Sequence, residues 1–240
     1  MEQEFLSNSL DKNFGIADEG KASIMAMPRS LKQLKKGQRV YSAGDDASMV
    51  NCVVSGWLTS VGEFSDGSRQ LLNFHVPIDF VGLEFLSQSQ AMSSLIAFED
   101  TTLIQLPVND FISVLQGSEK AALAILGVVG KKYLALQGRI SVFARGSALE
   151  KVAYLLLGLR AKQLRNDFKD PNALKLPLTQ HDIADALGLT NVTVSRAFSR
   201  LTKEGLVEYK LNQIIIKDPE RLRNCVLFLE NHGVSIDEFG

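Results

Sequence analysis

The sequence contains few of the residues that metal-binding and disulfide-rich proteins depend on. Of its 240 residues two are cysteines, Cys52 and Cys225, and three are histidines. Two cysteines do not make a disulfide framework, and an iron–sulfur cluster needs about four such ligands. His75, His181 and His232 are far apart in the sequence, so they do not form a ligand motif. We therefore predict no metal site and no iron–sulfur cofactor.

Long apolar runs and enzyme motifs are absent as well. No stretch is long and apolar enough to cross a membrane, and no charged-then-apolar secretion signal stands at the start. We therefore expect a cytoplasmic protein without a membrane partner. The sequence has no glycine-rich phosphate loop and no nucleophile elbow, and its separated histidines do not supply the metal cluster of a cupin. These absences argue against an enzyme.

The chain has almost no net charge, but its charges are unevenly distributed. It carries 26 Lys and Arg against 27 Asp and Glu. Residues 147–217 hold eleven basic and seven acidic residues, a net +4, so the remainder carries −5. A basic end on a chain long enough for two domains indicates a DNA-binding domain attached to another domain. Because the excess is modest, affinity must also come from specific contacts and from dimerisation.

Residues 178–217 have the pattern of a winged helix-turn-helix. Thr179 can cap a first helix with Asp182 folded back toward it, and Gly188 can end that helix in the left-handed conformation. Thr190 can cap a second helix, and two apolar runs after residue 204 predict a β-hairpin, the wing. We therefore favour DNA binding over a purely structural helical hairpin. The residues expected to be buried in the two helices are Ile183, Ala184, Leu187, Val194, Ala197, Phe198 and Leu201.

The front half contains short strand-like runs separated by turns between residues 34 and 107. Runs at 39–41, 49–54 and 69–74 alternate with turn signals, and Asp66-Gly67 marks a hairpin tip. Many short strands at regular spacing predict a barrel or jelly roll. Cys52 lies within one of these strands, where a buried core position is expected rather than a redox sensor.

A long helix is predicted between the two halves, at 117–145. Apolar residues recur along it at alternating spacings of four and three, starting at Ala122. This heptad seam favours pairing with an identical helix, although Leu123 and Ile125 could instead pack on the chain's own β-roll. Ser147, just after a predicted hinge, can cap the next helix. The predicted dimer-interface residues are Leu126, Val129, Tyr133, Leu136, Ile140 and Phe143.

Both halves, in this order, resemble the CRP/FNR superfamily of bacterial transcription regulators. Within it they resemble the FNR/FixK-like branch, because Ser195-Arg196 is similar to the Ser-Arg pair of that branch, although the iron–sulfur cysteines are lacking. The resemblance spans about residues 30–217 and implies an α+β fold. An N-terminal double-stranded β-helix, a jelly roll of the cyclic-nucleotide-binding type, would be joined by a long dimerisation helix to a C-terminal winged helix-turn-helix. It also implies a homodimer that binds a two-fold symmetric double-stranded DNA site, with RNA polymerase as a partner. The residues that carry it in the β-roll are Lys36-Gly37, 41–45, Gly56, Asp66-Gly67 and 80–84.

We accordingly expect five segments along the chain. They are an N-terminal arm or short helix (1–27), a sensor-like β-roll (28–116), the dimerisation helix (117–145), the winged-helix DNA-binding domain (147–217) and a helical tail (218–240). In the tail, a helix over 220–231 would bury Leu222, Val226 and Leu229.

The resemblance also assigns roles on the second helix of the DNA-binding domain. Arg196 matches the family arginine that bonds a guanine, a pairing worth about 1–3 kcal/mol of discrimination. The family usually has a glutamate where this chain has Val192, which can contact a thymine methyl, so we expect an altered half-site at that base pair. Phosphate contacts are expected from the start of the first helix and from Lys210 or Asn212 on the wing. The predicted DNA-binding residues are Thr179, Gln180, Asn191, Val192, Thr193, Ser195, Arg196 and Arg200.

Family members that bind cyclic AMP use a Gly-Glu pair for the ribose and an Arg-Ser pair for the phosphate. The matching positions here are Gly82-Leu83 and Ser93-Ser94, so the carboxylate is displaced to Glu84 and the arginine is missing. A buried anion needs a positive partner, so we expect no cyclic AMP binding unless Arg69 supplies the charge. No cofactor is predicted.

The alternative left open is a small-ligand, haem or redox sensor whose β-roll effector switches DNA binding. His75 would be the haem ligand in that case, although an isolated histidine in a β-roll is more often structural. The candidate effector pocket comprises Arg69, Gly82, Leu83, Glu84, Ser93 and Ser94.

Overall fold

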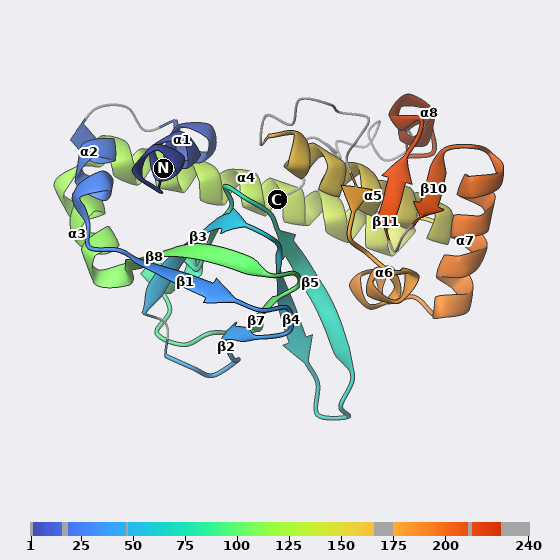
Figure 1. Ribbon diagram of the computed structural model, residues 1–240, viewed down its shortest axis with the longest axis horizontal. Helices are drawn as coiled ribbons and strands as arrows, with labels where there is room; N and C mark the ends of the chain where they lie inside the picture. The colour runs from blue at the N-terminus through green and yellow to red at the C-terminus, as the bar shows by residue number, and fades with distance from the viewer. Residues whose placement is uncertain (1, 16–18, 47, 166–174, 211–212, 227–240) are drawn as a thin grey trace. The chain divides into compact units, whose positions relative to one another are not determined.

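The computed structural model of the chain describes residues 2–15, 19–46, 48–165, 175–210 and 213–226 (Figure 1). The chain divides into two compact units, residues 1–129 and 130–240. Helix α4 (Glu119–Arg145) begins in the first unit and ends in the second. Each unit has its own core and is described by itself below.

Two antiparallel four-stranded sheets form the body of the first unit in the part of the chain described. One sheet has the strand order β1-β8-β3-β6, and the other has the order β2-β7-β4-β5. This is the jelly roll that the spacing of short strands predicts. The strands are β1 (Ser30–Leu34), β2 (Arg39–Tyr41), β3 (Met49–Ser55), β4 (Leu58–Glu63), β5 (Arg69–His75), β6 (Phe80–Val81), β7 (Ser94–Ala97) and β8 (Thr101–Pro107).

Two glycines fix sharp turns between these strands. Gly67 has a φ of 81° at the tip of the β4–β5 hairpin, which confirms the turn expected at Asp66-Gly67. Gly56 has a φ of 75°, and a Cβ at this position would lie 2.2 Å from the carbonyl oxygen of Asp100. Only glycine therefore allows the β3–β4 turn to approach the chain before β8 so closely.

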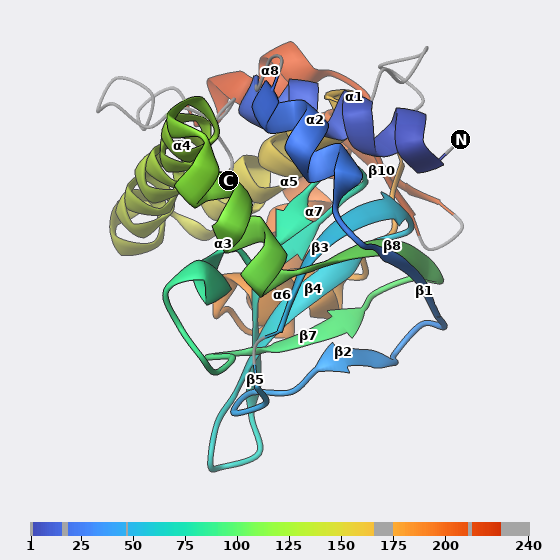
Figure 2. The ribbon, with the colours of Figure 1, turned by 90° about the vertical axis from the view of Figure 1, so that its left-hand side faces the viewer.

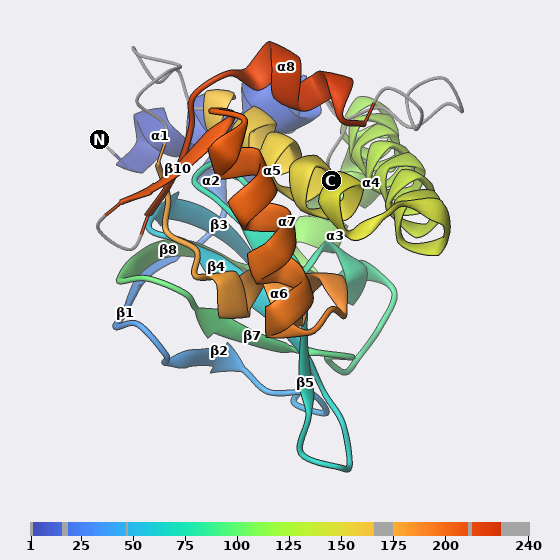
Figure 3. The same ribbon diagram turned by 90° about the vertical axis from the view of Figure 1, so that its right-hand side faces the viewer.

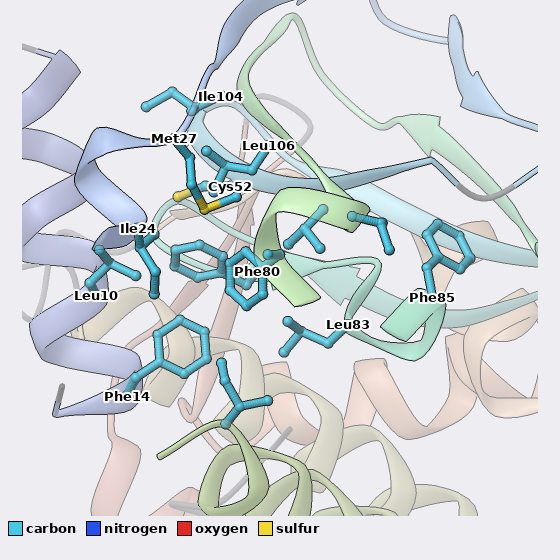
Figure 4. Close-up of a cluster of buried hydrophobic side chains, with 14 of the residues drawn as sticks. Leu10, Phe14, Ile24, Met27, Cys52, Phe80, Leu83, Phe85, Ile104 and Leu106 are labelled. Carbon is cyan, nitrogen blue, oxygen red and sulfur yellow. The ribbon is translucent and has the colours of Figure 1, made fainter. Parts of the chain in front are cut away.

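Of the two forms expected for the N-terminal residues, an arm or a short helix, the structure shows helix: two short helices pack on the β-roll. Helix α1 (Glu2–Phe14) and helix α2 (Glu19–Ala26) lie over the sheet that contains β3 and β8 (Figure 2). Their apolar side chains enter the same core as residues of the β-roll (Figure 4). The buried residues that the two helices and the turn after them contribute are Leu6, Leu10, Phe14, Ile24 and Met27.

Polar and aromatic contacts hold α1 in place. The rings of Phe14 and Phe80 meet edge to face at 4.7 Å. The side-chain amide of Asn13 donates to the carbonyl oxygen of Ile78 at 2.7 Å. Ile78 has a φ of 70°, a left-handed conformation that is costly for a β-branched residue, so the surrounding contacts must hold it there.

The β-roll leads into α4 through a short helix, α3 (Val108–Gly117). Among the described residues, no single helix is long and apolar enough to span a membrane. Helices α3 and α4 reach that length and composition only together, as a pair bent by 119°.

The second unit is built on the buried helix α5 (Ala148–Leu164), which contacts α6, α7 and α8 (Figure 3). Ser147 caps α5 as expected, in a reciprocal capping box with Glu150. The other elements are β9 (Lys175–Leu176), α6 (Gln180–Leu187), α7 (Asn191–Lys203), β10 (Val207–Lys210), β11 (Gln213–Ile216) and α8 (Pro219–Asn224).

The C-terminal helix is shorter than the 220–231 expected from the sequence. It ends at Asn224, with Cys225 as its C-cap. Leu222 and Val226 are buried, as predicted for its inner face. Leu229 lies outside the described residues.

Candidate nucleic-acid interface and β-roll pocket

Helix α6 begins and ends at the residues that the sequence indicates. The Asp182 backbone N–H donates to the Thr179 hydroxyl at 3.1 Å, and the Thr179 N–H donates to the Asp182 carboxylate at 2.9 Å. Gly188 ends the helix with a φ of 62°. These contacts satisfy backbone groups that a helix end otherwise leaves without partners, and they fix the turn that leads into α7.

Helix α7 is sharply divided into a buried and an exposed face. The Thr190 hydroxyl accepts the Thr193 N–H at 3.2 Å and so caps the helix. Val192 lies on the opposite, exposed face and is 60% accessible. The buried face comprises Val194, Ala197, Phe198 and Leu201, as predicted.

An open hollow runs along the exposed face of α7, beside the start of α6. It holds uncharged polar groups, one exposed valine and one guanidinium, and most of the predicted DNA-binding residues line it. Such a mixture of hydrogen-bonding groups, one cation and one methyl-rich contact suits the edges of base pairs. The hollow is lined by Gln180, Asn191, Val192, Ser195, Arg196 and Ser199.

The remaining predicted residues of this interface lie at its margin. Thr193 is half-buried and its hydroxyl bonds that of Thr190 at 2.8 Å. Arg200 pairs with Glu204 one turn along α7, at 2.9 Å, so its charge is partly engaged within the helix. His181 was not predicted from the sequence, yet it hydrogen-bonds Asn191 between the two helices.

The wing follows α7 as an antiparallel hairpin. β10 pairs with β11 from Val207↔Ile216 to Lys210↔Gln213, and β11 also pairs with β9. The ring of Tyr209 packs edge to face on Phe198 at 6.4 Å, which joins the wing to α7. The Lys210 side chain is exposed, and Asn212 lies outside the described residues.

Helix α4 carries two apolar stripes, and one of them was predicted from the sequence. The predicted seam is exposed: Leu126, Val129, Tyr133, Leu136 and Ile140 are between 44% and 65% accessible, and Phe143 is half-buried. Of the two residues that could instead pack on the β-roll, Leu123 is 59% exposed, whereas Ile125 is buried in the core of the first unit. The second stripe is buried and comprises Ala121, Ile125, Val128, Ala135 and Val142.

The Gly82 turn of the candidate effector pocket is tightly packed and presents an apolar side chain inward. Gly82 has a φ of 95°, and a Cβ there would lie 2.8 Å from the carbonyl oxygen of Met49 and 3.1 Å from the Phe85 ring. Leu83 is buried and Glu84 is exposed, so no carboxylate from this turn faces inward. The ribose contact that the family uses is therefore not reproduced by this turn.

Of the phosphate-side residues, Ser94 is engaged by an ion pair from neighbouring strands. The Ser94 hydroxyl donates to the Glu63 carboxylate at 2.7 Å and accepts from the Arg39 guanidinium at 2.8 Å. Arg39 and Glu63 form a two-pronged ion pair at 2.6 and 2.9 Å. Ser93 is half-buried, and Arg69 is exposed opposite Glu63 on the neighbouring strand. Arg39 was not predicted from the sequence. It supplies a cation beside Ser94, but its guanidinium is already paired with Glu63.

His75 and Cys52 are both buried within the β-roll. His75 is buried, and its Nε2 lies 2.8 Å from the Ser60 hydroxyl. Cys52 is fully buried, and burial raises the pKa of its thiol to about 12. Among the described residues, no three His, Cys, Asp or Glu side chains gather as a metal site. His232 lies outside them.

Comparison with known proteins agrees with this geometry. Residues 31–118 match the family model of the cyclic nucleotide-binding domain, and residues 150–225 match the model of the Crp-like helix-turn-helix domain. Both models fall where the β-roll and the winged unit lie in the structure.

Curated relatives and solved structures extend the match over most of the chain. The nitrogen fixation regulation protein FixK of Rhizobium meliloti (strain 1021) is 31% identical over 201 residues, which cover 83% of this chain and 89% of FixK. The transcriptional activator protein FnrA of Stutzerimonas stutzeri is 29% identical over 189 residues, 78% of this chain and 76% of FnrA. The structure of FixK2 from Bradyrhizobium japonicum matches with a TM-score of 0.74 and 27% identity, covering 83% of this chain and 98% of FixK2.

The chain therefore belongs to the CRP/FNR superfamily of transcription regulators, as the resemblance in its sequence predicted. It has that family's DNA-binding helix-turn-helix and its cyclic-nucleotide-binding type of β-roll. Members of the family are regulators rather than enzymes.

Proposed function

We propose that the protein is a homodimeric, sequence-specific regulator that places α7 in the major groove of a palindromic DNA site. The exposed face of α7 is the observation that carries the proposal. It combines the guanidinium of Arg196, the amide of Asn191 and the side chain of Val192, three groups that bond or touch base edges. Phosphate contacts from Thr179, Gln180 and the wing would set the position of the helix.

The exposed seam of α4 supports dimerisation. Five large apolar side chains on one stripe of a helix are unfavourable in water, and heptad spacing suits an identical partner helix. A two-fold dimer would present two copies of α7 to successive major grooves, about 34 Å apart. As a DNA-bound regulator in the bacterial cytoplasm, the dimer would act on transcription through RNA polymerase.

We also propose that cyclic AMP does not control this protein. Glu63 neutralises Arg39 beside Ser94, and the apolar Leu83 stands where the family's sugar contact would be. DNA binding would then need no added cyclic nucleotide. Whether the protein activates or represses a gene would depend on the position of its site relative to polymerase.

Genomic footprinting of the protein tests this function. The expected result is a set of protected sites that share a two-fold symmetric sequence upstream of genes. Their base preference should differ from the family's usual half-site at the pair facing Val192. Purified protein should bind such a site equally well with and without cyclic AMP. Protection without any shared sequence would contradict the proposal.

A further inference from the structure

One basic side chain lies among the covered positions of helix α4. Ala135 and Val142 are buried on the second stripe, and Arg139, four residues after the first and three before the other, shares their face of the helix. Burial lowers the pKa of the half-buried Arg139 guanidinium, which still stays charged because arginine does not lose its proton in proteins. A cation in such a place is costly unless polar groups compensate it.

The guanidinium of Arg139 lies beside groups of three helices in the second unit. Its Nη2 donates to the carbonyl oxygen of Ala186 in α6 at 3.4 Å, a long hydrogen bond. Its Cζ lies 5.1 Å from the ring centre of Phe143, one turn further along α4. Burial raises the pKa of Tyr154 in α5 to about 12, and the nearby charge of Arg139 opposes that rise. This one side chain therefore joins α4 to both α5 and α6.

The carbonyl group that Arg139 bonds belongs to the end of α6. The last four carbonyl oxygens of a helix have no amide partner within it, and that end carries partial negative charge. The amides of Gly188 and Leu189 both bond the carbonyl of Ala184. Arg139 supplies an N–H to Ala186 and places a positive charge at the negative end of α6, so both effects favour the contact.

This contact lies directly before the turn of the helix-turn-helix. Helix α6 stops at Gly188, two residues after Ala186, and Thr190 caps α7. A neighbouring face of α4 carries the exposed seam that would pair with a second copy. We propose that Arg139 is a positioning residue that holds the α6–α7 pair on α4, so that pairing along α4 sets the direction in which both α7 helices point. The inference rests on the proposed function, because it requires two copies of α7 on one duplex.

The test measures how strictly the protein requires one separation between its half-sites. A symmetric duplex that wild-type protein selects from a random library is compared with duplexes that have one base pair added or removed at the centre. One base pair moves a half-site by about 3.4 Å and turns it by about 35°. Two firmly held α7 helices cannot follow this change, so wild-type protein should bind the altered duplexes at least about ten-fold more weakly.

Variants at position 139 should relax this requirement. Arg139→Met keeps the apolar stem and removes the guanidinium. It should bind the selected duplex more weakly, and its affinities for the three duplexes should differ by less than about three-fold, because the α7 helices sample several directions. Arg139→Lys keeps the charge without the planar fork and should fall between Arg139→Met and wild type. Arg145→Met removes an exposed arginine from the same helix and, as the matched control, should behave as wild type.

Two further measurements separate positioning from a general structural role. Thermal unfolding and analytical ultracentrifugation show whether each variant is folded and dimeric, and Arg139→Lys replaces Arg139→Met in the comparison if the latter is not. Base preference within a half-site should stay unchanged in both variants, because the exposed face of α7 still carries Arg196.

Several outcomes would overturn the inference. One is a folded, dimeric test variant that keeps the full spacing requirement. An equal loss of affinity for all three duplexes with a smaller salt dependence would make Arg139 a phosphate contact instead. Equal relaxation in Arg145→Met would show a general effect of charge on α4. Wild-type protein that tolerates the one-base-pair changes overturns this inference alone, whereas wild-type protein without base preference, or bound as one chain per duplex, overturns the proposed function itself.

Discussion

Glu63 links the two partners that would otherwise be available to an anion in the β-roll. Its carboxylate accepts from the Arg39 guanidinium and from the Ser94 hydroxyl. These two hydrogen bonds lower the pKa of Glu63 from its ordinary 4.5 to about 2, with that of Arg39 as the larger effect. The pair is largely open to solvent, so water screens the attraction between its two charges. The Arg39 guanidinium is nonetheless bound to the Glu63 carboxylate.

The low pKa of Glu63 predicts a pH-dependent contribution to stability. Because the folded pKa lies below the unfolded one, the contribution is complete above about pH 4.5 and is lost as the pH falls toward 2. Wild-type protein should therefore exceed Glu63→Gln in the free energy of unfolding at pH 6, and the difference should shrink steadily as the pH falls from about 4.5 toward 2. Urea unfolding of both proteins measures this difference. Asp66 and Asp100 also have lowered pKa values, but both proteins contain them, so their contributions cancel in the comparison. A difference that does not change with pH would show that the ion pair has no such role.

Arg196 should dominate base selection on α7. Its guanidinium lies in the hollow, and a bidentate bond to guanine is worth about 1–3 kcal/mol of discrimination. Arg196→Ala should lose that discrimination and retain weak, salt-sensitive binding. Arg200→Ala serves as the matched control, because Arg200 lies on the same helix but pairs with Glu204 at 2.9 Å, and its loss should affect all sequences alike. Binding titrations on specific and scrambled duplexes measure both, and normal specificity in Arg196→Ala would contradict the docking of α7.

At the scale of elements, helices α1 and α2 complete the core of the β-roll. Leu10 of α1 is fully buried in the cluster that also contains Phe80 and Ile104 (Figure 4). The first helix contributes leucines and a phenylalanine four residues apart at positions 6, 10 and 14, one face of a helix. That spacing was available in the sequence and could have shown that residues 1–27 are more than an arm.

Removing one of these buried side chains should destabilise the first unit. Leu10→Ala should lower the free energy of unfolding by about 2–5 kcal/mol, the usual loss for a buried leucine that leaves a cavity. Asn8→Ala, at an exposed position of the same helix, is the control and should change stability little. Urea unfolding followed by circular dichroism measures both variants. Equal stability of the two would mean that α1 does not contribute to the core.

Elements defined by local signals were predicted from the sequence, whereas those defined by distant pairing were not. The limits of α6 follow from a capping residue and a terminal glycine, Thr179 and Gly188, which act within a few residues. Strand β1 was missed because three of its five residues are exposed, and β9 because it has only two residues and gains its partner from the wing. Such edge strands carry little alternation of their own.

The same distinction applies to the candidate sites. The exposed face of α7 follows from helical periodicity, so its residues could be named in advance. The partners of Ser94 could not, because Arg39 and Glu63 come from strands 55 and 31 residues away. The bond between His181 and Asn191 depends on the angle between two helices, which the sequence does not specify.

At the scale of the whole molecule, the proposed dimer depends on the exposed stripe of α4. Leu136 lies on the seam and is 53% exposed, whereas Leu134 lies off it and is 54% exposed. Leu136→Lys should therefore weaken dimerisation by placing a charge in the apolar seam. Leu134→Lys introduces the same charge at equal exposure and should leave the dimer intact. Analytical ultracentrifugation across micromolar concentrations measures both; two variants that both stay dimeric, or both become monomeric, would contradict the seam.

In the proposed complex two copies, joined along α4, present two α7 helices to one duplex at a fixed separation. The most direct test is the stoichiometry and affinity of binding to a symmetric site whose half-sites are moved apart by about five base pairs, half a turn of DNA. We predict two chains per duplex on the natural site and loss of specific binding after the insertion, because the second α7 would face the wrong side of the duplex. One chain per duplex, or an affinity that the insertion does not change, would contradict this arrangement of the dimer on DNA.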